Sequence, residues 1–521
     1  MADGAGPRLR FAELVATLAM ASDVGLGLPM EHAVRTCLLS VEMGRRLGMS
    51  DAELHDLYYL TLLRMLGCTV GAGDYAEYFG DEVAFGRDTQ HLDYGDQAGF
   101  GQWVMESFAV DQPPDRRRRM LDKLFTYTPD MRRSALAGHC EVAQMLAARL
   151  GFTGGVVEGL RFVFERWDGS GVPEGVGGEA LPAAVRVMTL CNEIEVHHRL
   201  GGMDAAVAMA GKRAGTAFDP AVVAVFQADP AGVLAVIGKP SVWSDLLAAE
   251  PGAARMADHQ ALIDAGGVMA DFADLKSTYL AGHSTRVAEL ADAAAERLKI
   301  DPAGRLTLRF AALAHDLGRV AVSTTIWDKP GPLNDTEWEQ VRLHPYYTER
   351  MLAKTPALAG AARLAGMHHE RQDGSGYHRG TRTAGEPVAA GVLAAADAYA
   401  AMRGDRAHRP ALDPDQAGDQ LRTMASAGQL DAAAVSAVLA AAGDTGPAVR
   451  RRWPAGLTAR EVDVLCRVGR GGSIQDAATD LHLAPKTVDF HLQNIYAKTG
   501  VSTRAAATLF AIQNNLLRPS P

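Results

Sequence analysis

The sequence predicts an all-α protein, and three observations support this prediction. Residues 251–425 are rich in Ala and Leu, with apolar residues spaced by three and four, as in helices that bury one face. An apolar helical run, Ala311–Ala314, ends in the pair His315-Asp316. Near the C-terminus, Glu461 follows Thr458 by three residues, which is a helix-starting pattern, and Pro485 fits the first turn of a further helix.

Length and composition favour a cytosolic protein of several domains. A chain of 521 residues suggests about three domains, and a hydrophobic content of 48% is enough for sizeable cores. We expect no membrane span, because no uncharged apolar run reaches about 18 residues. The first residues, MADGAGPRLRFAEL, lack the apolar stretch of a signal peptide. The five cysteines form no CxxC pair, as expected for reduced thiols in the cytoplasm.

Charge is distributed unevenly along the chain. The net charge is −10, but residues 451–521 contain nine Lys or Arg and five Asp or Glu, which gives +4. The remaining residues then contain 43 basic and 57 acidic side chains, which gives −14. A basic tail on an acidic body predicts that any contact with nucleic acid lies at the C-terminus.

A series of His and Asp side chains suits a metal site in the second half of the chain. A carboxylate is costly to bury unless it is paired or bound to a metal, and the two oxygens of one carboxylate can bridge two cations. Imidazole and carboxylate ligands without nearby Cys suit Fe, Mn, Zn or Ni. The series consists of His283, His315, Asp316, His344, His368, His369 and Asp397.

Residues 259–425 resemble an HD-GYP domain, a branch of the HD phosphohydrolases. The matching stretches include Thr325–Leu333, His344-Pro345, His368–Tyr377 and Asp397–Met402. The resemblance implies an all-helical domain with two divalent metal ions, typically Fe or Mn, that hydrolyses cyclic di-GMP. Carried over position by position, it makes all seven residues of the series metal ligands, with Asp316 and Arg319 catalytic. It assigns the substrate phosphates and bases to Arg319, Tyr377, Arg406 and Arg409.

Three positions depart from the HD-GYP pattern. Tyr279 replaces a Glu that members with a third metal have, so we expect two metals. Arg319 replaces a Lys, which keeps the charge but changes the shape of the cation. His378 replaces the Pro of the Gly-Tyr-Pro signature, which removes a rigid residue from the loop. These changes leave the metal ligands intact and alter the substrate side of the site.

Residues 1–250 contain a degenerate copy of the same pattern. The stretch Phe164–Pro173 matches His369–His378, and the copy includes an insert of about 46 residues from Gly71 onward. Arg64-Met65 replaces the His-Asp pair, Val163-Phe164 replaces the His-His pair, and only His32 and His139 remain. We expect no dinuclear metal site here. The copy is either a scaffold for the second copy or a regulatory pocket for a nucleotide or other small ligand.

The C-terminal domain, 451–521, resembles a LuxR-type helix-turn-helix domain of four helices. Residues Ile474–Leu481 predict a short helix, and Pro485–Lys498 predict a second helix whose buried face is Val488, Leu492 and Ile495. The resemblance implies that the second helix reads DNA in the major groove, as one half of a homodimer. The DNA-binding residues are expected to be Lys486, Thr487, His491, Asn494 and Lys498.

The predicted architecture is therefore two HD-type helical domains in tandem followed by the DNA reader. The domains are expected at 1–250 and 251–425, with a linker at 426–450. We expect a cytoplasmic bacterial transcription regulator with a metal-dependent phosphodiesterase that acts on cyclic di-GMP. Two alternatives stay open: a transcription factor that senses a cyclic dinucleotide without hydrolysing it, and an HD hydrolase of another phosphorylated nucleotide.

Overall fold

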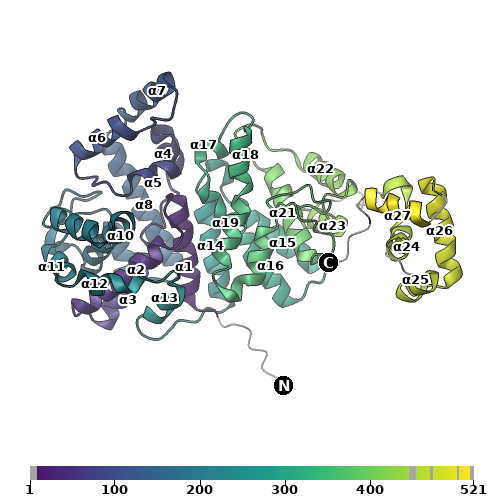
Figure 1. The fold of residues 1–521 in the computed structure, drawn as a ribbon, viewed down its shortest axis with the longest axis horizontal. Helices are drawn as coiled ribbons and strands as arrows, with labels where there is room; N and C mark the ends of the chain where they lie inside the picture. The colour runs from purple at the N-terminus through teal and green to yellow at the C-terminus, as the bar shows by residue number, and fades with distance from the viewer. Residues whose placement is uncertain (1–8, 445–452, 470–472, 502–503, 515, 517–521) are drawn as a thin grey trace.

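The computed structural model describes residues 9–444, 453–469, 473–501, 504–514 and 516. All the regular elements in these ranges are helices, which confirms the predicted all-α class (Figure 1). Many helices start at a side-chain cap that the sequence supplies. Asp301 caps Pro302–Ala314 and Asp413 caps Pro414–Ser426, each followed by Pro at the first helical position, where a missing N–H costs nothing.

The first copy consists of a helical bundle with an inserted helical subdomain. Its insert, α4 to α7, has a small apolar core of its own around Phe79, Val104, Phe108 and Leu124. The bundle helices are α1 (Phe11–Gly25), α2 (His32–Arg46), α3 (Asp51–Leu63), α8 (Pro129–Arg149), α9 (Gly155–Gly159), α10 (Ala183–Arg213), α11 (Pro220–Ala228), α12 (Pro230–Leu234) and α13 (Trp243–Ala249). The insert helices are α4 (Ala72–Phe79), α5 (Glu82–Thr89), α6 (Gln97–Ser107) and α7 (Pro114–Leu124).

The second copy repeats the order of the first without the insert. Helix α15 corresponds to α2, since each begins at the first His of the pattern, and α21 corresponds to α10. Its elements are α14 (His259–Asp274), α15 (His283–Arg297), α16 (Pro302–Ala314), η5 (Leu317–Ala321), α17 (Thr324–Trp327), α18 (Asp335–Arg342), α19 (His344–Leu352), α20 (Ala359–Gly366), α21 (Val388–Arg403), α22 (Pro414–Ser426) and α23 (Ala432–Ala441).

The linker expected at 426–450 is shorter than the sequence suggested. Helix α23 lies inside that range, yet Ala434, Val435 and Val438 are buried in the core of the second copy, and α23 packs against α15 and α21. The prediction was wrong here because an Ala-rich run has little periodic contrast, so its burial cannot be seen in the sequence. Residues 445–450 lie outside the described residues.

The two copies share one hydrophobic core instead of forming separate domains. Helix α1 is buried on all sides from Phe11 to Asp23, and it packs against α2 and α3 of its own copy and against α14, η5 and α19 of the other. Figure 1 shows α1 between the bundle of the first copy and α14. A helix that is apolar all round requires cover on every side, which the second copy supplies.

The C-terminal domain has a separate core. Its helices are α24 (Ala459–Gly469), α25 (Ile474–Asp480), α26 (Pro485–Thr499) and α27 (Arg504–Gln513), preceded by η7 (Pro454–Gly456). The capping box of Thr458 and Glu461 is present as expected, with the Glu461 N–H donating to Thr458 Oγ1 at 3.2 Å. Figure 1 shows this domain beyond α22 and α23, at the end of the molecule away from the first copy.

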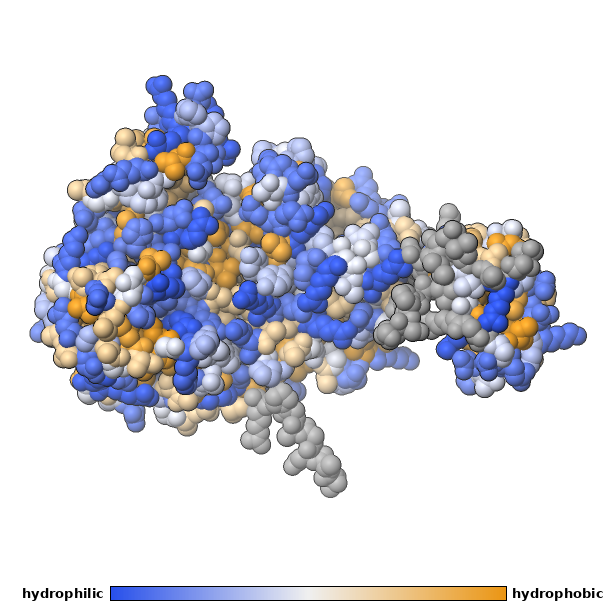
Figure 2. Space-filling model, viewed as in Figure 1, coloured by the Kyte–Doolittle hydropathy of each residue, from blue (hydrophilic) through white to orange (hydrophobic). Residues whose placement is uncertain are grey.

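The visible surface is mixed in polarity. Figure 2 shows hydrophobic residues in scattered patches among hydrophilic ones. Within the described ranges, no single helix is long and apolar enough to cross a membrane. Helix α11 and the segment Pro230–Ile237 together have the length and composition of a span, but a bend of 88° separates them.

Candidate metal centre

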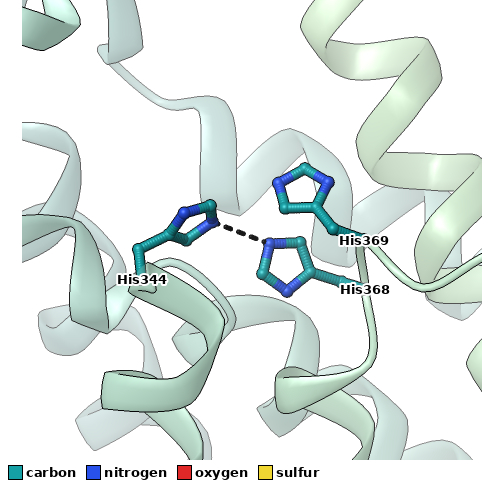
Figure 3. A group of neighbouring side chains, drawn as sticks. All are labelled: His344, His368 and His369. Carbon is teal, nitrogen blue, oxygen red and sulfur yellow. Dashed lines mark hydrogen bonds between the residues drawn. The ribbon is translucent and has the colours of Figure 1, made fainter. Parts of the chain in front are cut away.

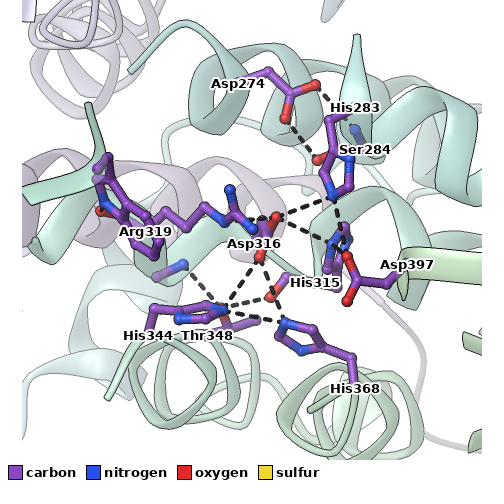
Figure 4. A network of polar contacts seen from close by, with 12 residues as sticks. Asp274, His283, Ser284, His315, Asp316, Arg319, His344, Thr348, His368 and Asp397 are labelled. Atoms are coloured by element: carbon purple, nitrogen blue, oxygen red, sulfur yellow. Dashed lines mark hydrogen bonds and ion pairs between the residues drawn. The ribbon is translucent and has the colours of Figure 1, made fainter. Parts of the chain in front are cut away.

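The ends of the bundle helices bring the seven predicted ligands together. His283 is the first residue of α15, His315 ends α16, and His344 is the first residue of α19. His368 and His369 follow the end of α20, and Asp397 lies in the middle of α21. Six of these side chains are fully buried and His369 is nearly so, which places a highly polar cluster inside the second copy (Figure 4).

Asp316 lies at the centre of this cluster and divides it into two halves. Its Oδ2 lies 3.1 Å from His315 Nε2 and 3.5 Å from His283 Nε2. Its Oδ1 lies 3.4 Å from His344 Nε2 and 3.5 Å from His368 Nε2. The two oxygens of one carboxylate therefore face two different pairs of imidazoles, which is the arrangement that a bridging ligand requires.

Asp397 has a similar position on the other side of the cluster. Its Oδ1 lies 3.2 Å from His283 Nε2, and its Oδ2 lies 3.6 Å from His369 Nδ1. His344, His368 and His369 form the second half of the cluster, with 3.2 Å between the Nε2 atoms of His344 and His368 (Figure 3). One half therefore offers His283, His315 and Asp397, and the other offers three imidazoles.

Backbone carbonyls fix the orientation of three imidazole rings. The Nδ1 atoms of His315, His344 and His368 lie 2.6–2.7 Å from carbonyl oxygens three residues earlier in the chain. Because a carbonyl only accepts, each Nδ1 carries a proton, and each Nε2 faces the cluster as the ring atom that could bind a metal. This is the usual outer-shell arrangement of a metal-binding His.

Burial and charge act on the cluster in opposite directions. Burial lowers the pKa of His283 and of His344 to about 4, so both rings are neutral at pH 7. Burial alone would raise the pKa of Asp316, but the Arg319 guanidinium and His315 outweigh it and hold that pKa well below its usual range. Burial alone would lower the pKa of His315, but the Asp316 and Asp397 carboxylates outweigh it and raise that pKa to about 10. The two buried carboxylates thus draw positive charge into the site, as a proton on His315 or as a divalent cation in its place.

The donor atoms fit a pair of divalent metal ions. The buried atoms His315 Nε2, Asp316 Oδ1 and Asp316 Oδ2 have no hydrogen-bond partner, and all three face the middle of the cluster. Unsatisfied buried polar atoms are costly, so atoms of this kind indicate a missing partner that they would bind. The mixed nitrogen and oxygen set suits Fe or Mn and is poor for a thiolate-preferring metal. Among the described residues, all three groups of neighbouring metal-type ligands lie in the second copy.

Arg319 lies beside the cluster, as the sequence indicated. Its Nε is 2.7 Å from Asp316 Oδ2, although it is not aligned for a hydrogen bond, and its guanidinium lies 4.8 Å from the centre of the Trp327 ring. The indole N–H of Trp327 donates to the Arg319 carbonyl at 3.1 Å. This buried arginine is therefore held in place by stacking on the indole and by attraction to the bridging carboxylate.

The other predicted substrate residues differ in position. Tyr377 lies at the cluster, with its ring 4.6 Å from that of His369. Arg406 donates to the Tyr279 carbonyl at 2.7 Å, and burial together with the Arg319 charge lowers its pKa to about 10. Arg409 instead donates to four backbone carbonyls around the end of α21, at 2.7–3.4 Å. The expected phosphate contact of Arg409 is thus replaced by a structural one, because the helix end leaves carbonyls unpaired.

Two buried polar residues that the sequence did not single out support the ligands. Asp274 accepts hydrogen bonds from the Ser284 N–H at 3.0 Å and hydroxyl at 2.8 Å, which fixes the first turn of α15. The hydroxyl of Thr348 donates to the His315 carbonyl at 2.9 Å and accepts from the Gly318 N–H at 2.8 Å. Only the spacing of Thr348, four residues after His344, could have pointed to it.

In the first copy a cation takes the place of the metal ligands, as expected. His32 Nε2 lies 3.0 Å from a terminal nitrogen of Arg64 and 2.9 Å from Asn192 Oδ1, and His32 Nδ1 pairs with Glu195. His139 Nε2 lies 3.0 Å from the Arg64 carbonyl, and burial lowers the pKa of His139 to about 4. The two remaining His residues thus both contact Arg64, the cation that stands where the second copy has His315.

The predicted DNA-reading helix has the expected buried face. Val488, Leu492 and Ile495 of α26 are buried, Lys486 is exposed, and Thr487, His491 and Asn494 are partly exposed. Lys498 differs from the prediction, since its Nζ pairs with both oxygens of Glu461 at 2.7 and 2.9 Å and so joins α26 to α24. Phe490, which the sequence reading passed over, is 63% exposed on the same helix.

The fold and the buried His/Asp cluster define a metal-dependent phosphohydrolase of the HD type. Residues 267–434 match the HD domain family, and residues 455–511 match the family of bacterial regulatory proteins of the luxR type. The 3′3′-cGAMP-specific phosphodiesterase 3 of Vibrio cholerae is 31% identical over 410 residues, which cover 78% of this chain and 89% of that protein. A cyclic di-GMP phosphodiesterase of Thermotoga maritima is 34% identical over 129 residues, 24% of this chain and 35% of that protein.

A solved structure supports the same assignment. The crystal structure of a cyclic GMP-AMP-specific phosphodiesterase of V. cholerae matches with a TM-score of 0.58 and 27% identity, covering 85% of this chain and 99% of that one. The chain belongs to the HD-GYP phosphodiesterase family and carries a LuxR-type domain at its C-terminus. It is a hydrolase.

Proposed function

We propose that the second copy hydrolyses a phosphodiester bond of a cyclic dinucleotide. The observation that carries the proposal is the placement of Asp316, whose two oxygens each face a separate pair of imidazoles. His283, His315 and Asp397 would hold one metal ion, His344, His368 and His369 the other, and Asp316 would contact both. Two such ions lower the pKa of water and neutralise charge on phosphoryl oxygens.

The residues around the cluster would bind and orient the substrate. Arg319 provides a fixed positive charge beside the metal ligands, where negative charge develops on the phosphoryl oxygens. Arg406 adds a second cation near the same place, and the Tyr377 ring beside His369 offers a flat apolar face for a base or sugar. Burial of the cluster excludes bulk water and strengthens these electrostatic contacts.

The substrate is proposed as cyclic di-GMP, with 3′3′-cGAMP as a second candidate. Cyclic di-GMP is named for the relative in T. maritima, while the relative that matches over most of its length is specific for 3′3′-cGAMP. The test is to incubate the full chain, loaded with Mn²⁺ or Fe²⁺, with each dinucleotide and to separate the linear products. Turnover by the wild type that is absent in Asp316→Ala supports the enzyme. Tight binding of the dinucleotide without turnover would favour a sensor instead.

We further propose that the C-terminal domain binds DNA as a homodimer. Lys486 is exposed and Thr487, His491 and Asn494 are partly exposed on α26. The exposed Phe490 ring would offer an apolar contact to a thymine methyl group. Analytical ultracentrifugation with and without the cyclic dinucleotide would give the oligomeric state. Selection of bound sequences from a random DNA pool would give the half-site, and a palindromic consensus is expected of a dimer.

A further inference from the structure

A large cavity lies in the first copy, over the position where the second copy holds its ligands. Its volume is 690 Å³, within the range of small-molecule sites. It is lined by residues of the insert helices α4 to α6 and of α8 and α10, and it is open to solvent on one side. Arg64, which replaces His315 of the second copy, lines it together with Asn192 and His139.

Arg64 is a half-buried cation without a carboxylate in ion-pair contact. Its Nη2 lies 3.0 Å from His32 Nε2, its buried Nε has no hydrogen-bond partner, and within the described residues no carboxylate oxygen lies within 4.0 Å of it. Burial lowers the pKa of Arg64. A buried guanidinium nitrogen without a partner is costly, and an anionic ligand that accepts from it would remove that cost.

The carboxylates nearest to Arg64 are each bound to another group. Glu195 pairs with His32 and Arg199, and Glu193 pairs with Arg213. Asp23 accepts from the Ala33 N–H at 3.0 Å, and burial raises its pKa to about 7. None of the three is available to neutralise Arg64 by direct contact.

A second cation and a set of aromatic rings line the same cavity. Arg132 forms no ion pair in the described part of the chain, and its guanidinium lies 5.8 Å from the centre of the Tyr94 ring. The hydroxyl of Thr69 is buried and has no hydrogen-bond partner. The aromatic lining includes Tyr75, Phe79, Phe85, Tyr94, Phe100 and Phe218.

Four carboxylates also line the cavity, and each already has partners. Glu82 pairs with Lys276, Asp93 with Arg166, and Glu193 with Arg213. Glu165 accepts from the Glu174 and Gly175 N–H groups of its own loop.

We propose that this cavity is a binding site for a nucleotide, with the base against the aromatic rings and the phosphate on Arg64 and Arg132. A planar ring suits a wall of aromatic side chains, and a phosphate suits the donor fork of a guanidinium. The site is distinct from the metal centre and uses residues that the metal-binding copy does not have.

The wall of the cavity is continuous with the metal-binding copy. Lys276 and Glu82 both line the cavity, and they form an ion pair of 2.7 Å between the two copies. Lys276 also donates to the Val320 carbonyl at 3.2 Å, one residue after Arg319. A nucleotide in the cavity therefore lies against the contact that positions η5, and we expect its binding to change the turnover rate of the second copy.

Binding is tested on the full chain carrying Asp316→Ala, with a chelator present so that the second copy cannot hydrolyse the probe. The affinity for each of four probes, GMP, AMP, cyclic di-GMP and 3′3′-cGAMP, is measured by isothermal titration calorimetry. Arg64→Gln is expected to weaken binding about tenfold to a hundredfold, as for loss of a charged hydrogen bond, and Arg64→Lys to weaken it less. Arg116→Gln, on the exposed helix α7 outside the cavity, is the matched control and should leave the affinity unchanged.

A second variant keeps the test decisive if Arg64→Gln fails to fold. Arg132 also lines the cavity, is only half-buried, and has no ion pair in the described part of the chain, so Arg132→Gln removes the second cation with little effect on packing. Binding of a probe that Arg132→Gln weakens about tenfold or more supports the proposal. If none of the four probes binds at millimolar concentration, or if Arg132→Gln leaves the affinity unchanged, the proposal is wrong.

Discussion

Glu82 of the first copy and Lys276 of the second form a buried ion pair, with Glu82 Oε1 2.7 Å from Lys276 Nζ. The same carboxylate accepts from the Thr324 N–H at 2.8 Å and from the Ser323 hydroxyl at 2.7 Å, at the start of α17. Burial alone would raise the pKa of Glu82, but Lys276 and the hydrogen bonds outweigh it and lower that pKa. The insert of the first copy thus holds the segment that follows Arg319.

Glu82→Gln is expected to destabilise the joint core of the two copies. The change leaves the Lys276 ammonium buried without its partner, which typically costs about 3–5 kcal/mol. The urea unfolding midpoint should fall, and turnover should fall with it. Glu77→Gln is the control, since the pair of Glu77 with Lys123 is exposed and should contribute little. An unchanged midpoint for Glu82→Gln would show that this ion pair contributes little to holding the two copies together.

Asp316 and His369 are expected to differ in their effect on metal content. Asp316→Ala removes the carboxylate that faces both halves of the cluster, so both metal ions should be lost. His369→Ala removes a ligand from one half only and should leave about one metal ion per chain. Elemental analysis of the purified variants gives the ratio, and turnover of Asp316→Ala should fall by roughly 10³-fold or more. Full metal content in Asp316→Ala would contradict the bridging role.

Arg319→Met should lower kcat by about 10²-fold, since it removes a fixed charge beside the reacting phosphate. Arg319→Lys should recover part of the loss, but not all, because Lys lacks the planar fork that stacks on Trp327. Metal content is measured on the same samples. If metal content falls in parallel with kcat, Arg319 acts by holding Asp316 and not by binding substrate.

Lys486 and Lys498 lie on the same helix and should behave differently. Lys486→Ala removes an exposed charge and should weaken DNA binding. The slope of log K, the DNA association constant, against log salt concentration should become shallower by about one. Lys498→Ala breaks the pair with Glu461 and should lower the melting temperature of the C-terminal domain. Fluorescence anisotropy at several salt concentrations and calorimetry separate the two effects. If the dependence of DNA affinity on salt concentration changes equally in both variants, Lys498 contacts DNA as the sequence predicted.

Asp23 provides a pH-dependent term in stability. Burial raises its pKa from 3.8 to about 7, so its contribution to stability is fully present below about pH 4 and is lost as the pH rises to about 7. Asp23→Asn cannot ionise and should lack this loss, on the order of 4 kcal/mol at most. The difference in unfolding midpoint between Asp23→Asn and wild type should therefore grow in favour of the variant from pH 4 to pH 7. A constant difference would show that Asp23 ionises normally.

Local sequence patterns were sufficient for the helical class, and the resemblance to HD-GYP domains supplied the seven candidate ligands that the fold brings together. His315-Asp316 and His368-His369 are adjacent in the chain, and each pair lies at a helix end that apolar spacing and Gly residues reveal. The contacts that Arg409 and Lys498 make within the protein could not be predicted from local sequence patterns. Each was assigned from its chemistry and position in a motif, but the carbonyls around Arg409 and the Glu461 carboxylate become neighbours only when separate segments pack.

The sequence by itself determined the fold class, the repeated pattern, the seven candidate ligands and the replacement of most of those residues in the first copy. These features depend on residue identity and on spacing along one helix, which are local. The tertiary structure alone decided that the two copies share a core around α1, that Asp316 lies between two sets of imidazoles, and that Arg64 faces a cavity of 690 Å³. Those features arise from contacts between residues far apart in the chain, whose distances no local pattern contains.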